Sequence, residues 1–465
     1  MTNNKIRTRI APSPTGPFHV GNARTALFNF LFTKKHGGRI YLRIEDTDKE
    51  RSRKEYENDI IASLKWLGLG WDGGIIRQSE RGDIYNKHLG KLLDEGQAFY
   101  CFHPAEESEK TLPSLAHICD HKHLTAADLE SRHLKEGIIR LKNPGGAISW
   151  PDIVRGEVLF EAELLGDISL AKDLDTPLYN FAVVADDHEM GITHVIRGED
   201  HISNTPKQIL IQRALVFDPP QYAHVPLILG SDRSKLSKRH GATSVSEYRE
   251  QGYLPEAVIN FLVLLGWHPQ DNQEIFSLEE LIDKFDLSRV QKGGAIFNVD
   301  KLDSTNQHYI KSLSVENLAD LLKPYLNEFN PTANQLSKIA KHFQDRLKKL
   351  SDIKELAGYI FELPDYEARL LCWKNTSLQE TLENLELIKR KLEGLNERQF
   401  DIDYLTTELM PLVNEKGRGE VLWPLRVAIS GLDKSLGPFE LMEILGKDET
   451  LSRLNLAIDR LSKAN

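Results

Sequence analysis

The sequence predicts an α/β protein built on a doubly wound parallel sheet, with an inserted α+β domain and an all-α C-terminal bundle. Strand-like and helix-like segments alternate in residues 1–100 and again in 181–240. Between them, residues 101–180 hold short strand-like runs and turns rich in Gly and Pro. After about residue 325 only helical periodicity remains. Alternation indicates parallel strands joined by helices, whereas an unbroken helical pattern indicates a bundle.

The first hundred residues predict two strands, each followed by a helix. Lys5–Ile10 and Arg39–Ile44 are short apolar runs typical of strands. Gly21–His36 and Tyr56–Leu67 have helical spacing, and each ends at glycine. In a parallel sheet of this kind, ligands bind at the carboxyl ends of the strands. We therefore expect functional side chains just after residues 10 and 44.

The middle of the chain predicts an interruption and then a return to the α/β pattern. Within the insertion, Ile148–Ile153 and Glu157–Glu161 are expected to be strands. After the insertion we expect three more strands, at Phe181–Ala185, Thr193–Ile196 and Ala223–Leu229. We expect one helix among them, at Lys207–Leu215. Asn204-Thr205-Pro206 is a favourable helix start, because a capping side chain precedes proline.

Composition describes an ordinary globular protein. Of 465 residues, 40% are hydrophobic and 28% are charged, and the net charge is −10. No apolar run is long enough to cross a membrane, the N-terminus lacks a secretory segment, and three cysteines offer no disulfide framework, so we expect a cytoplasmic protein. The negative charge permits nucleic-acid binding only through a local basic face.

Two short segments carry the strongest chemical signal. Pro14–Asn22 follows a strand and opens a helix, so its backbone N–H groups lie at a helix N-terminus, where anions bind readily. Lys235–Arg239 is a loop with two lysines three residues apart, which could neutralise the charge of a polyphosphate. Taken singly, the histidine of the first segment could be a helix cap and the lysines a solvated loop. Together the segments indicate an enzyme that adenylylates its substrate with ATP.

These two segments resemble the HIGH and KMSKS signatures of class I aminoacyl-tRNA synthetases. Flanking segments are similar to the bacterial-type glutamyl-tRNA synthetases, namely Arg7–Gly16, Leu42–Asp48, Val195–His201 and Val421–Arg426. The resemblance implies that ATP with Mg²⁺ activates L-glutamate, which then passes to the 3′ end of tRNA(Glu). It departs from the signatures at Asn22, which stands where HIGH ends in histidine, and at Arg239, which stands where KMSKS ends in serine.

The resemblance also implies domains and an oligomeric state. We expect a monomer with a Rossmann-type catalytic domain in two halves, an inserted domain that binds the acceptor stem, a helical region that contacts the stem, and an anticodon-binding region. The expected boundaries are 1–100 and 181–240, 101–180, 241–325, and 326–465.

The expected site residues follow from the same comparison. For ATP it implies Thr15, His19, Gly21, Asn22, Lys235 and Lys238, of which His19, Lys235 and Lys238 would be catalytic. For glutamate it implies Arg9, Ser13, Glu45, Tyr179 and Arg197. Arginine suits the two carboxylates and an acidic side chain suits the ammonium group. Which arginine reads the side-chain carboxylate stays open. The alternative is a surface network in which Arg43, Glu45, Asp46 and Asp48 pair among themselves.

A cysteine–histidine cluster indicates a possible structural zinc site. Cys101-Phe102-His103 and Cys119-Asp120-His121 would supply four nitrogen and sulfur ligands if a short loop brought them together. The alternative is a metal-free loop.

Three functions remain open from the sequence. The first is a glutamate–tRNA ligase, either specific for tRNA(Glu) or also charging tRNA(Gln). The second is a paralogue that glutamylates a different tRNA or a modified nucleoside. The third is an inactive RNA-binding or regulatory paralogue. Intact His19, Lys235 and Lys238 argue against the third.

Overall fold

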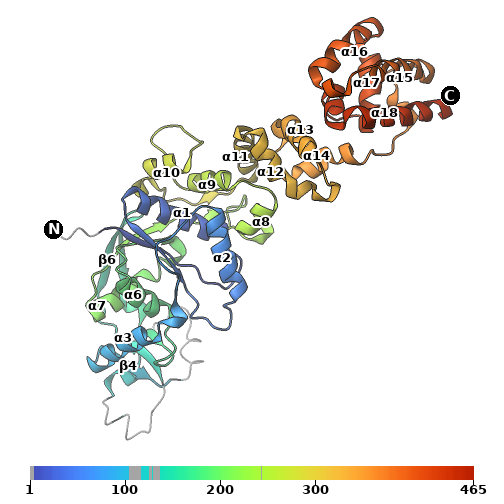
Figure 1. The fold of residues 1–465 in the computed structure, drawn as a ribbon. Helices are drawn as coiled ribbons and strands as arrows, with labels where there is room; N and C mark the ends of the chain where they lie inside the picture. Colours follow the sequence, from blue (N-terminus) through green and yellow to red (C-terminus); the bar gives the residue numbers. More distant parts are fainter. Residues whose placement is uncertain (1–4, 104–116, 125–127, 129–136, 242, 465) are drawn as a thin grey trace. The chain divides into compact units, whose positions relative to one another are not determined.

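The computed structural model describes residues 5–103, 117–124, 128, 137–241 and 243–464, except for the side chain of Lys238. Two compact units make up the chain. The first comprises Met1–Glu250 and Leu254–Thr305, and the second comprises Gln251–Tyr253 and Asn306–Asn465. Figure 1 colours the α/β unit from blue to yellow and the helical unit mainly in orange and red.

Parallel strands form the centre of the first unit. β1 (Arg7–Ile10), β2 (Arg39–Ile44) and β3 (Ile76–Arg77) pair in that order, and β9 (His194–Gly198) pairs with β10 (Gln221–Val225). The main chain next to β9 also bonds to β1, because Thr193 N donates to Arg7 O at 3.0 Å. The helices of this part are α1 (Val20–Lys35), α2 (Lys54–Trp66), α3 (Gly82–Asp94), α6 (Tyr179–Glu189) and α7 (Thr205–Leu215). The predicted α/β class is confirmed.

The insertion contributes two antiparallel groups of strands. β4 (Ala98–Cys101), β5 (Ile138–Leu141) and β8 (Ile168–Ala171) form one sheet. β6 (Ala147–Asp152) and β7 (Gly156–Glu161) form a hairpin. The end of β6 also pairs in parallel with β10, at Asp152 and Tyr222, so this hairpin extends the sheet that contains β9.

Two predicted strands were wrong in whole or in part. Phe181–Ala185 lies inside α6, where its residues are buried together with Asp186 and Asp187. A helix buried on all sides has no polar face, so a short apolar run within it resembles a buried strand. Ala223–Leu229 is not continuous, because Pro226 separates β10 from β11 (Ile228–Leu229), which pairs with β12 (Ala295–Ile296). Proline has no N–H to donate to a sheet.

Helices follow to the end of the chain. The first unit adds α8 (Val245–Glu250), α9 (Pro255–Leu264) and α10 (Leu278–Lys284), and α11 (Val299–Ser312) runs from the first unit into the second. The second unit continues with α12 (Val315–Leu326), α13 (Ala333–Phe343), α14 (Asp352–Phe361), α15 (Leu378–Glu393), α16 (Ile402–Lys416), α17 (Arg418–Ser430) and α18 (Pro438–Ala464). Its described residues contain no strand, which confirms the predicted all-α region. Among the described residues, no helix has both the length and the apolar character that crossing a membrane demands.

Candidate active site

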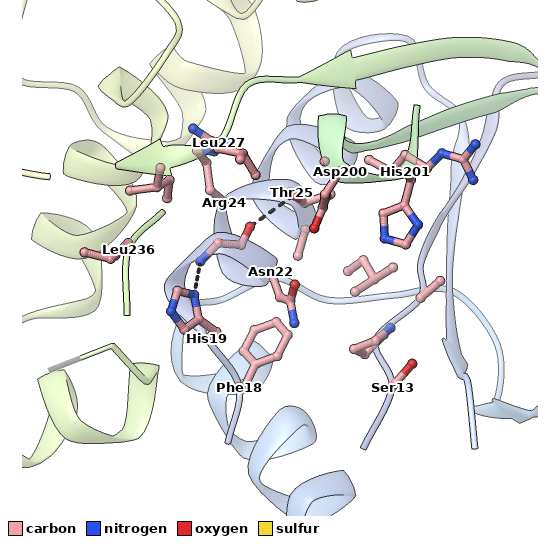
Figure 2. A pocket seen from close by; sticks show the side chains of 18 of the residues that line it. Ser13, Phe18, His19, Asn22, Arg24, Thr25, Asp200, His201, Leu227 and Leu236 are labelled. Atoms are coloured by element: carbon pink, nitrogen blue, oxygen red, sulfur yellow. Dashed lines mark hydrogen bonds between the residues drawn. The ribbon is translucent and has the colours of Figure 1, made fainter. Parts of the chain in front are cut away.

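One cavity of about 640 Å³ in the first unit lies at the carboxyl ends of β1, β2 and β9. It gathers most of the residues expected from the sequence, and Figure 2 shows part of it, with Ser13, His19, Asn22, Asp200 and His201 among the labelled side chains. The expected residues that line it are Arg9, Ser13, Thr15, His19, Gly21, Asn22, Glu45, Tyr179, Arg197 and Lys235. Lys238 begins a short 3-10 turn, but its side chain lies outside the described part of the structure.

Main-chain hydrogen bonds join the first signature-like segment to the chain just after the second. Val20 N donates to Thr243 O and Val245 N donates to Phe18 O, both at 2.9 Å. Asp59, on α2, holds the same segment, because Phe18 N donates to its Oδ2 at 2.7 Å. Two segments more than two hundred residues apart therefore border one cavity.

His19 caps α1. Its Nδ1 accepts a hydrogen bond from Gly21 N at 3.0 Å, so this amide is already occupied and is not an open anion donor as expected. Because Nδ1 accepts, the neutral ring carries its proton on Nε2. Burial, and then the nearby charge of Lys235, lower the pKa of His19, although Glu247 opposes them. His19 is therefore a helix cap, which was the alternative considered above, and its ring still has one N–H donor, at Nε2.

The second signature-like loop carries two ion pairs. Lys235 Nζ lies 3.2 Å from Asp200 Oδ2, and both side chains are largely exposed. Arg239 lies 3.1 Å from Asp232, so its added charge is already paired. Exposed pairs of this kind are weak, and a polyanionic ligand can replace the acidic partner.

A buried charge cluster lies beside the cavity. Asp187, on α6, accepts from Arg9 Nε at 3.2 Å and from Arg43 Nη1 at 2.6 Å. Arg43 Nη2 also lies 2.9 Å from Glu45 Oε1. Burial would raise the pKa of Asp187, but the two guanidinium groups hold it below its usual value. At Glu45 burial raises the pKa more than the charges of Arg43 and Arg9 lower it, so the pKa is above its usual value.

The alternative, in which Arg43, Glu45, Asp46 and Asp48 pair among themselves, therefore holds for only one pair of these residues. Glu45 pairs with Arg43, whereas Asp46 accepts from the amide and hydroxyl of Ser79, and Asp48 pairs with Arg51. Glu45 still lines the cavity. The sequence did not indicate Asp187, because this residue follows the apolar run Phe181–Ala185, which resembles a strand. Two consecutive acidic residues next to such a run were the available signal.

Tyr179 and His201 form a neutral pair at the cavity wall. The Tyr179 hydroxyl lies 3.1 Å from His201 Nδ1. Burial, and then Glu45, raise the pKa of Tyr179 to about 12. Burial, and then the charge of Arg197, lower the pKa of His201 to about 4. Both side chains are uncharged at neutral pH.

The four residues of the expected metal cluster also meet. Ligand atoms of Cys101, His103, Cys119 and His121 all lie within 4.8 Å of one another. Nδ1 of His103 is 3.4 Å from Cys101 Sγ and 3.6 Å from Cys119 Sγ, and Nδ1 of His121 is 3.6 Å from Cys119 Sγ. Tetrahedral zinc with ordinary bond lengths separates sulfur and nitrogen ligands by roughly 3.6 Å, so the donor set fits.

The surroundings of this cluster also suit a metal. His103 Nε2 lies 3.3 Å from Asp120 Oδ1, the kind of partner that orients a metal-binding imidazole. Burial raises the pKa of the Cys119 thiol to about 12, so a metal would have to displace its proton. Sequence reasoning did not assign His117, whose Nε2 lies 3.6 Å from Cys101 Sγ. The run of histidines in this segment was its only signal.

Comparison with known proteins gives a consistent result over the whole chain. Residues 5–304 match the family described as the catalytic domain of class I tRNA synthetases (E and Q), and residues 317–458 match an anticodon-binding domain. Glutamate–tRNA ligase 2 of Thermoanaerobacter pseudethanolicus is 42% identical over 99% of both chains. The glutamate–tRNA ligase of Thermodesulfovibrio yellowstonii is 43% identical over 98% of this chain and 99% of its own.

A solved structure agrees with these sequence relatives. The glutamate tRNA ligase of Elizabethkingia meningosepticum, in complex with its amino acid, is 34% identical, with a TM-score of 0.88 over 98% of this chain and 100% of that one. Both signature-like segments, the cavity between them and the helical second unit thus occur in a chain that matches these proteins from end to end. The chain belongs to the glutamate–tRNA ligase family of the class I tRNA synthetases.

Proposed function

We propose that this protein is a glutamate–tRNA ligase, which activates L-glutamate with ATP and Mg²⁺ and transfers it to the 3′ end of tRNA(Glu). One observation carries the proposal: residues of both ATP signatures line a single cavity together with Arg9, Glu45 and Arg197. ATP and an acidic amino acid could therefore lie next to each other. The family membership supports the same assignment.

The proposed roles in the ATP half follow from where charge develops. Attack of a carboxylate on the α-phosphate releases pyrophosphate, and negative charge spreads over the leaving group. The Nε2–H of His19 and the ammonium groups of Lys235 and Lys238 would donate to these oxygens. Thr15, Gly21 and Asn22 would border the nucleotide. No protein nucleophile takes part, so positioning supplies the catalysis.

The proposed glutamate half pairs opposite charges. The guanidinium groups of Arg9 and Arg197 would bind the two carboxylates, and Glu45 would bind the ammonium group. Ser13 and the neutral hydroxyl of Tyr179 would add hydrogen bonds. Glutamine carries no second carboxylate, so it would leave one buried arginine without a partner and bind worse.

We assign tRNA contacts to the remaining regions. The insertion, residues 101–180, would bind the acceptor stem, residues 241–325 would contact the stem further along, and residues 326–465 would read the anticodon. The match of residues 317–458 to an anticodon-binding domain supports the last role. We further propose a cytoplasmic monomer.

Aminoacylation with labelled glutamate and separate tRNA(Glu) and tRNA(Gln) transcripts tests this function. Charging of tRNA(Glu) alone is expected for a specific enzyme, and charging of both would identify a non-discriminating one. If no tRNA in a complete pool is charged, the enzyme proposal is wrong and the RNA-binding alternative takes its place.

We propose that Cys101, His103, Cys119 and His121 hold one structural zinc ion. The protein purified without chelator is expected to contain about one zinc per chain, and Cys119→Ala should lose it. Cys372→Ala is the matched control, because that buried cysteine lies in the helical unit and outside the cluster. Zinc far below stoichiometry in the parent protein would favour the metal-free loop.

A further inference from the structure

Protein acceptors hold the Arg197 guanidinium on three sides. Arg197 is 5% exposed, and its side chain donates from Nε to His224 Nε2 at 3.1 Å, from Nη2 to Thr205 Oγ1 at 2.8 Å and from Nη1 to Gln208 Oε1 at 2.9 Å. A guanidinium has five N–H groups. Contacts with described residues thus use three of them and leave one N–H on each terminal nitrogen, so that both terminal nitrogens can still donate to a carboxylate.

The bond to His224 requires one particular tautomer. Nε2 can accept from Arg197 only if it carries no proton, so the ring proton must be on Nδ1. Nδ1 lies 2.5 Å from Asp152 Oδ2, and both of these side chains are fully buried. Burial lowers the pKa of His224 more than the hydrogen bond to Asp152 raises it, and the charge of Arg197 lowers it further, which favours the neutral ring. A carboxylate, an imidazole and a guanidinium thus form one chain of hydrogen bonds.

The main chain fixes the Asp152 carboxylate. Its Oδ1 accepts from Val154 N at 3.0 Å, from Arg155 N at 2.9 Å and from His224 N at 3.2 Å. These three donors leave only Oδ2 for the His224 ring. Asp152 ends β6 of the insertion, His224 lies on β10, and Arg197 lies on β9, so three strands contribute to the chain of hydrogen bonds.

We propose that Asp152 and His224 are positioning residues for the glutamate-binding site, because they set the imidazole tautomer that holds Arg197 with two N–H groups free for a substrate carboxylate. This inference rests on the proposed function. It predicts that the two residues act on glutamate binding without touching the substrate.

Asp152→Asn should reverse the tautomer without changing the size of the side chain. The three backbone donors will keep the amide oxygen in the Oδ1 position, so the amide NH₂ group will face Nδ1 of His224. That nitrogen must then accept, and the proton moves to Nε2. There it faces the Nε–H of Arg197, which loses its acceptor, and among the described residues it can be donated only to Thr205 Oγ1, 3.0 Å away. The KM for glutamate should rise roughly tenfold to a hundredfold, the loss expected for a broken charge-assisted hydrogen bond, while the KM for ATP stays nearly unchanged.

Two substitutions of His224 separate positioning from packing. His224→Gln can keep an acceptor near the Nε2 position but loses the link to Asp152, so its KM for glutamate should stay within about threefold of the parent. His224→Asn can keep the link to Asp152 but cannot reach Arg197, so it should behave like Asp152→Asn. In the double variant Asp152→Asn/His224→Gln, the Asp152 substitution should cost little, because no tautomer remains to be reversed.

The matched control is His194→Asn. His194 lies on the same strand as Arg197, its ring packs 4.9 Å from that of Phe32, and it does not line the cavity. This control should keep the parent KM for glutamate. If folded Asp152→Asn keeps the parent KM, or if its effect adds fully to that of His224→Gln, the inference is wrong.

Nitrogen NMR of histidine-labelled parent protein tests the tautomer without any substitution at Asp152. The His224 signals, assigned by their loss in His224→Gln, should show a protonated Nδ1 and an unprotonated Nε2 at neutral pH. A protonated Nε2 would overturn the inference even if every Asp152 variant failed to fold. A parent protein that charges no tRNA would instead reject the proposed function, and the NMR result would still decide the tautomer.

Discussion

Two arginines, one in each unit, are buried to a similar degree and yet differ in what surrounds them. Arg197 is 5% exposed and Arg453 is 2% exposed. Arg197 lines the cavity and uses three of its five N–H groups on side chains. Arg453 makes four hydrogen bonds, whose acceptors are the carbonyls of Tyr359, Ile360 and Ile429 and the carboxylate of Glu449.

This difference separates a binding group from a structural one. A buried charge is costly wherever it lies, and both arginines are compensated. Arg453, on α18, donates to main-chain carbonyls at the ends of α14 and α17, and these hydrogen bonds link both helices to α18. Arg197 keeps two donors beside an open space. Burial alone therefore does not mark a site, whereas Arg197 combines burial with donors that border a cavity.

The largest expected effect is on stability, in Arg453→Met. The substitution leaves three buried carbonyls without donors, and we expect the helical unit to lose about 3–5 kcal/mol. Hydrogen exchange of amides in α17 and α18 measures this directly. Arg369→Met, which removes one longer hydrogen bond to Thr376 O, is the control. Protection that matches the parent would mean that Arg453 does not hold the unit together.

The next effect is on rate, in Lys238→Ala. This loop lysine is expected to stabilise charge that appears only as pyrophosphate leaves, so activation should slow by roughly 10²–10³-fold. The melting temperature should not change, which is the reverse of the result for Arg453. Lys301→Ala, which removes an exposed pair with Glu274, serves as the control. A rate close to the parent would remove Lys238 from the mechanism.

Arg9→Gln should have a smaller effect that depends on the substrate. Arg9 is buried and, among the described residues, its side chain pairs with Asp187 through Nε, which leaves its terminal nitrogens for a ligand. We expect kcat/KM for glutamate to fall about tenfold to a hundredfold and the preference over glutamine to shrink. Competition between the two amino acids in aminoacylation measures that preference. An unchanged preference for glutamate over glutamine would mean that Arg9 does not take part in substrate recognition.

The smallest effect is on pH dependence and concerns Glu443 of the helical unit. Burial would raise its pKa, but contacts with His342 at 2.5 Å and Lys341 at 3.3 Å hold that pKa below its usual value. A lowered carboxylate pKa contributes stability above the unfolded value, and that contribution disappears as the pH falls through the folded value. Acid should therefore destabilise the parent more steeply than Glu443→Gln. Parallel acid-unfolding curves would contradict this.

The sequence predicted those parts of the fold and site that local pattern determines. Arg9 and Glu45 were expected near the cavity because each stands at or just after a strand end, and a parallel sheet brings such ends together. Asp152 and His224 were not expected, because their pairing depends on β6 joining β10, a long-range pairing that no local sequence pattern indicates. The strand expected at Phe181–Ala185 failed since apolar content alone does not distinguish a buried helix from a buried strand.

The two main-chain hydrogen bonds between the first signature-like segment and the residues just after the second have a consequence for gene recombination. Val20–Thr243 and Val245–Phe18 pair through N–H and C=O groups, which every residue except proline supplies in full. Side chains in both segments can thus diverge between lineages without loss of the alignment across the cavity. A chimeric protein that joins the first half of one relative to the second half of another should therefore retain these two hydrogen bonds without further substitutions.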